Sequence, residues 1–232
     1  MVASGRPHHP LIGILMLETS FPRYVGDVGN PLSFDFPVRY KVVPGATPEA
    51  IVQGDLAPWV NAFVAAGQAL VTEGCKGLGT TCGFLTPLRK EVAATCGVPV
   101  VSSALDLIPD LLAEGRRPGI LTISARSLGP AHLAAAGVPD NLPVTGCDDT
   151  HFARTILADR SDLDPVQSEA DVATAAERLC ANHTEIDVIV LECTNMPPYA
   201  AAITAATSRP VVSILTGLSA MQRSLAAIAA WP

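Results

Sequence analysis

Two of the six cysteines, Cys82 and Cys193, occupy equivalent positions in an internal repeat, and they are the strongest candidates for chemistry in this chain. A shift of 111 residues aligns residues 82–102 with residues 193–213 and gives seven identities in 21 positions without a gap. The matches include both cysteines, two prolines and a Pro-Val-Val-Ser segment. We interpret the repeat as an internal duplication that supplies one cysteine from each half of the chain.

Two thiols on opposite walls of one cleft are suited to proton transfer at a carbon next to a carboxylate. One thiolate can remove a proton from one face of that carbon, while the other thiol returns a proton to the opposite face, and this chemistry needs no cofactor. Backbone amides at a helix start would stabilise the negative charge that develops, and they should also lower the thiol pKa. The alternative is that both cysteines are buried packing residues, copied together with their lobes.

The elements that position these cysteines follow a βα rhythm. Apolar, β-rich segments alternate with longer helical patterns, which predicts an α/β fold with mainly parallel sheets flanked by helices. Each repeated cysteine follows an expected strand and precedes an expected helix, so both should lie at the carboxyl edge of a sheet, where α/β proteins bind ligands. The expected strands are 11–17, 38–42, 75–79, 98–102, 119–123, 142–145, 187–191 and 210–214, and the expected helices are 58–73, 86–96, 128–136, 168–182, 197–207 and 217–230.

The duplication also predicts how the chain divides into lobes. We expect lobe 1 to comprise residues 1–105 plus 215–232 and to carry Cys82, and lobe 2 to comprise residues 106–214 and to carry Cys193. An approximate two-fold axis between the lobes would bring the two thiols to opposite walls of one cleft.

The segments around the two cysteines resemble the aspartate/glutamate/hydantoin racemase superfamily. These segments are Thr81-Cys82-Gly83 and Glu192-Cys193-Thr194-Asn195, and the resemblance extends over nearly the whole chain. It implies two pseudo-symmetric flavodoxin-like lobes with a cofactor-independent, two-cysteine site between them. It also implies substrate-binding groups beside each cysteine and after the first strand of each lobe, which by position are Thr81, Gly83, Thr194, Asn195, Glu18, Thr19, Thr122 and Ser124.

The resemblance implies an isomerase, namely a racemase or epimerase of an amino acid such as aspartate or of a hydantoin-like compound. Two departures bear on the substrate. Asn195 stands where glutamate racemases have His and many aspartate racemases have Glu, and Glu18-Thr19 replaces the Asp-Ser pair of glutamate racemases, which disfavours glutamate. Alternatives are an enzyme of the same superfamily that resembles maleate isomerase or arylmalonate decarboxylase, or a non-catalytic binder of small acids. Two cysteines disfavour decarboxylation, because those decarboxylases retain only the second one.

The segment 19–37 is long for a connection within a compact domain and directly follows an expected strand. Long loops in such places are often lids over a site. Arg23 in this segment could bind a second carboxylate or a ring carbonyl of the substrate. It could equally be an exposed arginine on a mobile loop.

Composition excludes several other classes of protein. Fifteen Lys and Arg against 22 Asp and Glu give a net charge of −7, and the basic residues are scattered, so nucleic acid is not an expected partner. No apolar run is long enough to span a bilayer, and the first ten residues lack the pattern of a secretion signal, so we expect a cytoplasmic protein without membrane partners.

The cysteines form no CxxC pair and lack a His at ligand spacing, so we expect no metal. The expected partners are a small carboxylate substrate and, from the resemblance, a second copy of the chain in a homo-oligomer such as a dimer.

Overall fold

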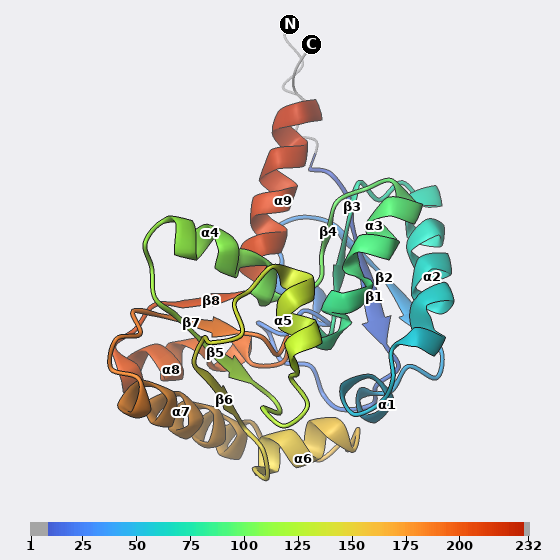
Figure 1. Ribbon diagram of the computed structural model, residues 1–232. Helices are drawn as coiled ribbons and strands as arrows, with labels where there is room; N and C mark the ends of the chain where they lie inside the picture. The colour runs from blue at the N-terminus through green and yellow to red at the C-terminus, as the bar shows by residue number, and fades with distance from the viewer. Residues whose placement is uncertain (1–8, 230–232) are drawn as a thin grey trace, which may run out of the picture.

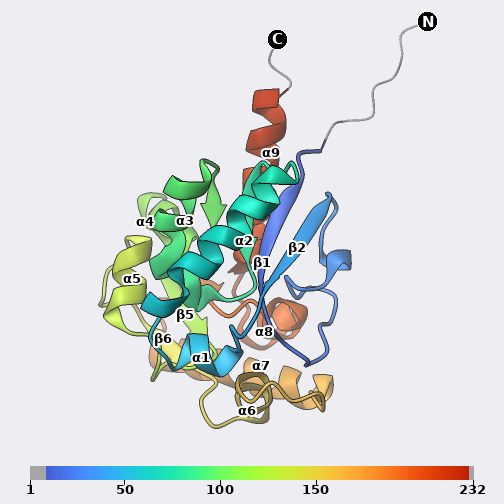
Figure 2. The same cartoon turned by 90° about the vertical axis from the view of Figure 1, so that its right-hand side faces the viewer.

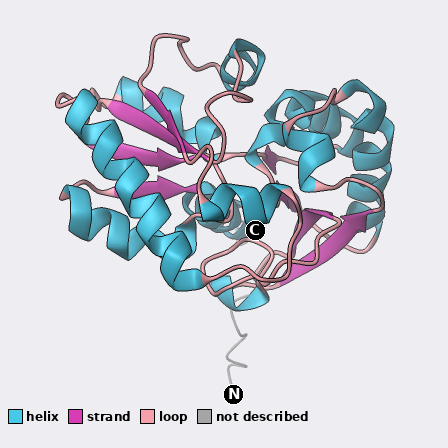
Figure 3. Cartoon of the chain, turned by 90° about the horizontal axis from the view of Figure 1, so that it is seen from below, coloured by secondary structure: helices cyan, strands magenta, loops and turns pink. Residues whose placement is uncertain are grey.

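The computed structural model describes residues 9–229. The chain forms two four-stranded parallel sheets with helices on their faces, which confirms the predicted α/β class with two lobes (Figures 1 and 3). The expectation about secretion rested on the first ten residues, of which residues 1–8 lie outside the described part of the chain.

The two sheets share one strand order. The first has the order β2-β1-β3-β4 and the second the order β6-β5-β7-β8, with every neighbouring pair parallel. The same order in both halves is what a duplicated chain should show. The strands are β1 (Ile12–Leu17), β2 (Val38–Val43), β3 (Gly77–Thr80), β4 (Val100–Val101), β5 (Pro118–Thr122), β6 (Val144–Gly146), β7 (Val188–Leu191) and β8 (Val211–Ser213).

Burial within the sheets follows the position of each strand. The inner strands β3, β5 and β7 are buried along their whole length, and β1 nearly so, whereas the edge strand β2 alternates between partly exposed and exposed side chains until its end. This pattern is typical of parallel sheets covered by helices on both faces. All eight expected strands are present, and each end lies within two residues of its expected position.

Nine helices accompany the sheets within residues 9–229. They are α1 (Pro48–Val52), α2 (Val60–Thr72), α3 (Arg89–Cys96), α4 (Ile108–Ala113), α5 (Pro130–Ala136), α6 (His151–Leu157), α7 (Pro165–Asn182), α8 (Ala200–Thr207) and α9 (Ile214–Ala229). Short 3-10 turns precede several of them: η1 (Pro31–Ser33), η2 (Ala57–Trp59), η3 (Gly83–Leu88), η4 (Ala104–Leu107) and η5 (Pro197–Tyr199). Six of the nine were expected from the sequence, and the short helices α1, α4 and α6 were not.

The last helix returns to the first sheet. α9 directly follows β8, yet Leu218 and Met221 form a buried cluster with Ile12 and Ile14 of β1, and the helix then rises out of the body of the molecule (Figure 1). The division of the chain into lobes at 105/106 and 214/215 stays a prediction. No helix in residues 9–229 combines the length and the apolar character that crossing a membrane requires.

Candidate active site

The Cys82 loop connects β3 to η3 at the carboxyl edge of the first sheet. Cys82 has extended backbone angles, with φ −154° and ψ 119°, and is the residue before the first turn of η3. Thr80 fixes this loop, because its Oγ1 accepts a hydrogen bond from the backbone N–H of Cys82 (3.3 Å) and donates one to the backbone oxygen of Ser102 (2.7 Å). The loop is therefore tied to the end of β3 and to the segment after β4.

The Cys193 loop holds the equivalent position after β7 in the second sheet. The hydroxyl of Thr194 donates a hydrogen bond of 2.6 Å to the backbone oxygen of Thr81, so the two cysteine loops are in direct contact across the lobes. The Cys193 thiol donates to Oδ1 of Asn195 at 3.7 Å. Each loop thus positions one cysteine at the junction of the two sheets.

Both cysteines line one small cavity at this junction. Cys82 is 8% exposed and Cys193 is 6% exposed. The cavity measures about 20 Å³, which is room for roughly one water molecule, so any substrate larger than water must widen it. Its wall also contains Leu17, Thr19, Phe21, Arg23, Pro48, Val52, Thr81, Gly83, Phe84, Ile123, Ile156, Glu192, Thr194 and Asn195.

Six of the nine predicted substrate-binding residues lie on this wall, namely Thr19, Arg23, Thr81, Gly83, Thr194 and Asn195. The other three do not. The Glu18 carboxylate is exposed and accepts a hydrogen bond from the backbone of Gly45 (2.7 Å), and the Thr122 hydroxyl donates to Glu192 (2.7 Å) behind the wall. Ser124 bonds Asp148 at 2.7 Å instead. Binding roles for all nine residues stay predictions.

Ser124 lines a separate, wider pocket of about 390 Å³. Three of its charged side chains pair with one another, since Arg126 bonds both Asp148 and Asp149. No cysteine lines this wider pocket. The smaller cavity, with its two thiols, is therefore the better candidate for chemistry.

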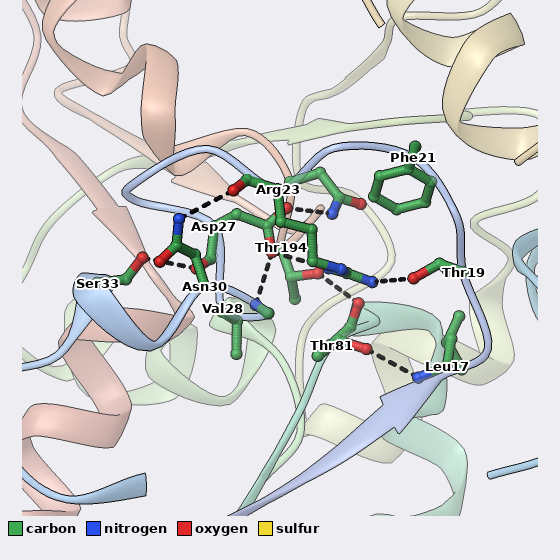
Figure 4. A network of polar contacts seen from close by, with 12 residues as sticks. Leu17, Thr19, Phe21, Arg23, Asp27, Val28, Asn30, Ser33, Thr81 and Thr194 are labelled. Atoms are coloured by element: carbon green, nitrogen blue, oxygen red, sulfur yellow. Dashed lines mark hydrogen bonds and ion pairs between the residues drawn. The ribbon is translucent and has the colours of Figure 1, made fainter. Parts of the chain in front are cut away.

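Arg23 is buried beside the cysteines, and its interpretation as an exposed arginine is wrong. Its side chain is 8% exposed, stacks on Phe21, and bonds Asp27 at 2.8 Å and Thr19 at 2.9 Å (Figure 4). Asp27 is the centre of this network and was not singled out from the sequence. The spacing of Arg23 and Asp27, four residues apart with opposite charge, is the signal that could have found it.

Asp27 connects the segment after β1 to the Cys193 loop. Its second oxygen, Oδ2, accepts a hydrogen bond of 2.6 Å from the side-chain amide of Asn195. Because that amide donates to Asp27, its oxygen is left to accept from the Cys193 thiol. Asn195 thus orients Cys193 as a neutral hydrogen-bond donor.

Glu192 is the second functional candidate to which sequence reasoning gave no role. It follows the apolar strand β7, is 0% exposed and lies on the cavity wall. A side chain at Gly83 would lie 2.2 Å from Oε1 of Glu192, so glycine is what allows the Cys82 loop to approach this carboxyl. An acid at the end of a buried strand, directly before a candidate cysteine, is the sequence signal for it.

The thiols differ from expectation in their pKa. Burial raises the pKa of Cys82 to about 12, and the charge of Glu192 adds to the rise, while the backbone N–H of Phe84 and the charge of Arg23 lower it. Burial and Glu192 likewise raise the pKa of Cys193 well above its ordinary value. The backbone amides do lower the thiol pKa, as expected. The expected net decrease is wrong, because the loss of solvation raises the pKa by more than the amides lower it.

The same environment raises the pKa of Glu192 to about 7, since burial penalises its charged form more than the Thr122 hydroxyl stabilises it. In residues 9–229, no group of three or more His, Cys, Asp or Glu side chains is arranged to hold a metal ion.

Comparison with known proteins identifies the family and corrects the expected reaction. The sequence matches the Asp/Glu/hydantoin racemase family over residues 46–221. It is 33% identical to a dimethylsulfoniopropionate lyase from Durusdinium sp. clade D over 88% of this chain and 71% of that protein. It is 32% identical to dimethylsulfoniopropionate lyase 3 from Emiliania huxleyi (strain CCMP1516), over 94% of this chain and 60% of that longer protein.

Among solved structures, a cysteine variant of arylmalonate decarboxylase in its sulfate-associated form superposes with a TM-score of 0.64 at 18% identity, covering 94% of both chains. At this identity the likeness concerns the fold alone. The relatives identified by sequence are lyases, so the expected assignment as an isomerase that racemises an amino acid or hydantoin is wrong. The two-lobed fold and the racemase family were predicted correctly.

Proposed function

Since the chain belongs to the Asp/Glu/hydantoin racemase family, we propose that it is a lyase of that family which cleaves dimethylsulfoniopropionate. The observation that carries the proposal is the presence of Cys82 and Cys193 on one buried cavity. Elimination next to a carboxylate begins with the same step as racemisation, the removal of a weakly acidic proton by a base shielded from water. The reaction changes after that step, because this substrate carries a leaving group.

The proposed reaction breaks one C–H bond and one C–S bond. A thiolate takes a proton from the carbon next to the substrate carboxylate, and the electron pair of that C–H bond becomes the second bond of a C=C double bond. The C–S bond on the neighbouring carbon breaks with both electrons going to sulfur. The products are dimethyl sulfide, acrylate and a protonated thiol, so the step needs no oxidant, reductant or cofactor.

Cys82 is the base in this scheme. Glu192 raises the pKa of both thiols and a backbone N–H lowers each, but the charge of Arg23 favours only the Cys82 thiolate, whereas Cys82 and Cys147 further raise the pKa of Cys193. Cys193 turns its single thiol proton from Asn195 towards the substrate and donates a hydrogen bond to the negative charge that develops there. Thr81, Gly83 and Thr194 supply further polar groups on the wall for the substrate carboxylate.

The test is direct measurement of both products. The purified protein is incubated with dimethylsulfoniopropionate, dimethyl sulfide is measured in the headspace by gas chromatography, and acrylate is measured in solution. We expect equal amounts of the two products. Cys82→Ala and Cys193→Ala should each lower the rate by about 100-fold or more, as loss of a proton-transfer group does.

Cys180→Ala is the matched control, because Cys180 lies on α7 and not on the cavity wall. It should retain the rate of the unchanged protein. Release of no dimethyl sulfide by the unchanged protein would overturn the proposal. Full activity in either cavity variant would overturn the role given to that cysteine.

A further inference from the structure

Glu192 is a buried acid with one oxygen left without a partner. Its Oε2 accepts a hydrogen bond of 2.7 Å from Thr122, whereas Oε1 is inaccessible to solvent and has no hydrogen-bond partner among residues 9–229. A buried carboxylate is normally paired with a cation or fully hydrogen-bonded, because losing its hydration is costly. In the protein alone, one of the two oxygens of Glu192 therefore lacks the interaction that would replace its hydration.

The protein supplies no obvious cation to balance Glu192. Among the described residues no Lys, Arg or His forms an ion pair with it. Arg23, the one basic residue on the cavity wall, is already paired with Asp27. When Glu192 is ionised, a cation to pair with it would come from a molecule that enters the cavity.

We infer that Glu192 binds the positively charged end of the substrate and so selects acids that carry an onium group close to their carboxylate. The inference rests on the proposed function and deepens it, because a sulfonium is such a group. A sulfonium has no N–H or O–H, so it is recognised by charge and not by hydrogen bonds. An oxygen without a donor, on a carboxyl fixed by Thr122, suits a cation of this kind.

The same contact explains how a thiol with a high pKa can serve as a base. The negative charge of Glu192 raises the pKa of both Cys82 and Cys193. A cation beside Glu192 offsets that charge and itself favours a nearby thiolate. The base therefore forms when the correct substrate is in place.

The geometry also predicts which kinetic constant changes. The sulfonium loses its positive charge as the C–S bond breaks, so its attraction to Glu192 is strongest in the bound substrate and weaker in the transition state. Removing the charge at residue 192 should therefore weaken substrate binding and raise KM by more than it lowers kcat.

The decisive experiment compares two ligands of the same shape that differ only in charge. These are 3-(trimethylammonio)propanoate, which is cationic at one end, and 4,4-dimethylpentanoate, in which carbon replaces the nitrogen. Binding is measured by calorimetry at pH 8 with the unchanged protein and with Glu192→Gln. We expect the unchanged protein to prefer the cationic ligand by about tenfold or more, and Glu192→Gln to lose most of this preference.

Glu185→Gln is the matched control, because it removes a surface carboxylate of the same lobe whose side chain is 56% exposed. It should leave the preference unchanged. A second measurement needs no variant, since the preference of the unchanged protein should fall as the pH is lowered and Glu192 is protonated. The thiols of Cys82 and Cys193 stay neutral over this range in the absence of a cation, because their pKa values are raised.

An equal preference for the cationic ligand in Glu192→Gln and in the unchanged protein would overturn the inference. Lack of any preference in the unchanged protein would overturn it as well. The binding measurement is independent of turnover. A protein that releases dimethyl sulfide but shows no effect of Glu192→Gln refutes only the inference, and one that discriminates by charge but releases no dimethyl sulfide refutes only the proposed function.

Discussion

Glu192 sets the electrostatics of the site at the scale of single residues. It lies against Gly83 in the Cys82 loop and directly precedes Cys193, so one carboxyl acts on both thiols. Such a group is expected to reduce stability when it is charged, because folding removes its hydration and supplies a hydrogen bond to only one of its two oxygens. If Glu192 serves binding at the expense of stability, its replacement should raise the free energy of unfolding.

Glu192→Gln should stabilise the protein at pH 8 but not at pH 4. Burial raises the pKa of Glu192 from 4.5 to about 7, so its contribution to stability is fully present below pH 4.5 and is lost as pH rises through 7. Glutamine carries no charge and escapes this loss. We expect the variant to gain up to about 3 kcal/mol in the free energy of unfolding at pH 8, measured by urea denaturation.

The control for this prediction is Glu185→Gln, which should show no such pH dependence because its carboxylate is exposed. The same stability difference between Glu192→Gln and the unchanged protein at both pH values would contradict the account. If Glu192→Gln is more stable but binds the cationic ligand poorly, the role of Glu192 is in binding and not in folding. A residue with a purely structural role would not destabilise the fold.

The segment between β1 and β2 is the element that covers the site. Asp27 holds it together, since its carboxylate accepts from the Arg23 side chain (2.8 Å), the Gly29 backbone (2.6 Å) and the Asn195 side chain (2.6 Å). Figure 4 shows Arg23 and Asp27 of this segment in one polar network with Thr194 of the Cys193 loop. One carboxylate therefore fixes both the cover of the cavity and the amide that orients Cys193.

Asp27→Ala should loosen this segment and make the Arg23–Tyr24 bond accessible to trypsin. The Arg23 side chain is buried in the intact protein and protected from the protease. Without its carboxylate partner, the segment should open locally, and cleavage after Arg23 should be about fivefold faster or more, as followed by mass spectrometry. Asp35→Ala, an exposed residue of the same segment, is the control and should leave cleavage unchanged. Equal protection of Arg23 in Asp27→Ala would show that other contacts hold the loop.

The sequence predicted the strands and the long helices well because their signals are local. Apolar, β-branched runs located all eight strands, and α7 was found through its helical composition. The helices α1, α4 and α6 span only five to seven residues, which is too short for a periodic pattern to be recognised, and they lack the Ala-rich composition by which the equally short α5 was found. The cysteine positions followed from the repeat. The thiol pKa could not be predicted, because it depends on burial and on Glu192 and therefore on the packing of the two lobes.

At the scale of the whole molecule, the cavity exists only where the two lobes meet. One buried cluster contains Leu15 and Leu78 from the first sheet and Ile120 and Val190 from the second, so the lobes share a continuous core. In the views of Figures 1 and 2, α1 of the first half lies beside α6 of the second half, and Val52 and Ile156 of these helices both line the cavity. Small shifts between the lobes therefore change the size of the cavity.

Contacts between the 19–37 segment and the second lobe hold this side of the cavity closed. Asp159 accepts hydrogen bonds from the backbone N–H of Ser20 (2.6 Å) and of Phe21 (3.3 Å), and the Tyr24 hydroxyl donates to the backbone oxygen of Leu163 (2.9 Å). Because the cavity of about 20 Å³ is too small for a substrate as it stands, we expect these contacts to open when a substrate enters.

Asp159→Gly should favour the open arrangement and expose the cysteines. Asp159 has φ +49°, a conformation that glycine adopts without strain, so the substitution removes the side-chain contacts with Ser20 and Phe21 and keeps the turn. We expect alkylation of Cys82 by iodoacetamide, followed by mass spectrometry, to be about fivefold faster or more than in the unchanged protein. Asp162→Ala removes a neighbouring carboxylate that pairs only with Arg160 of its own loop, and it should leave the rate unchanged. The substrate analogue 3-(trimethylammonio)propanoate should slow labelling in both proteins, because it occupies the cavity. Equal labelling rates in Asp159→Gly and the unchanged protein would show that access to the thiols does not pass between the 19–37 segment and the second lobe.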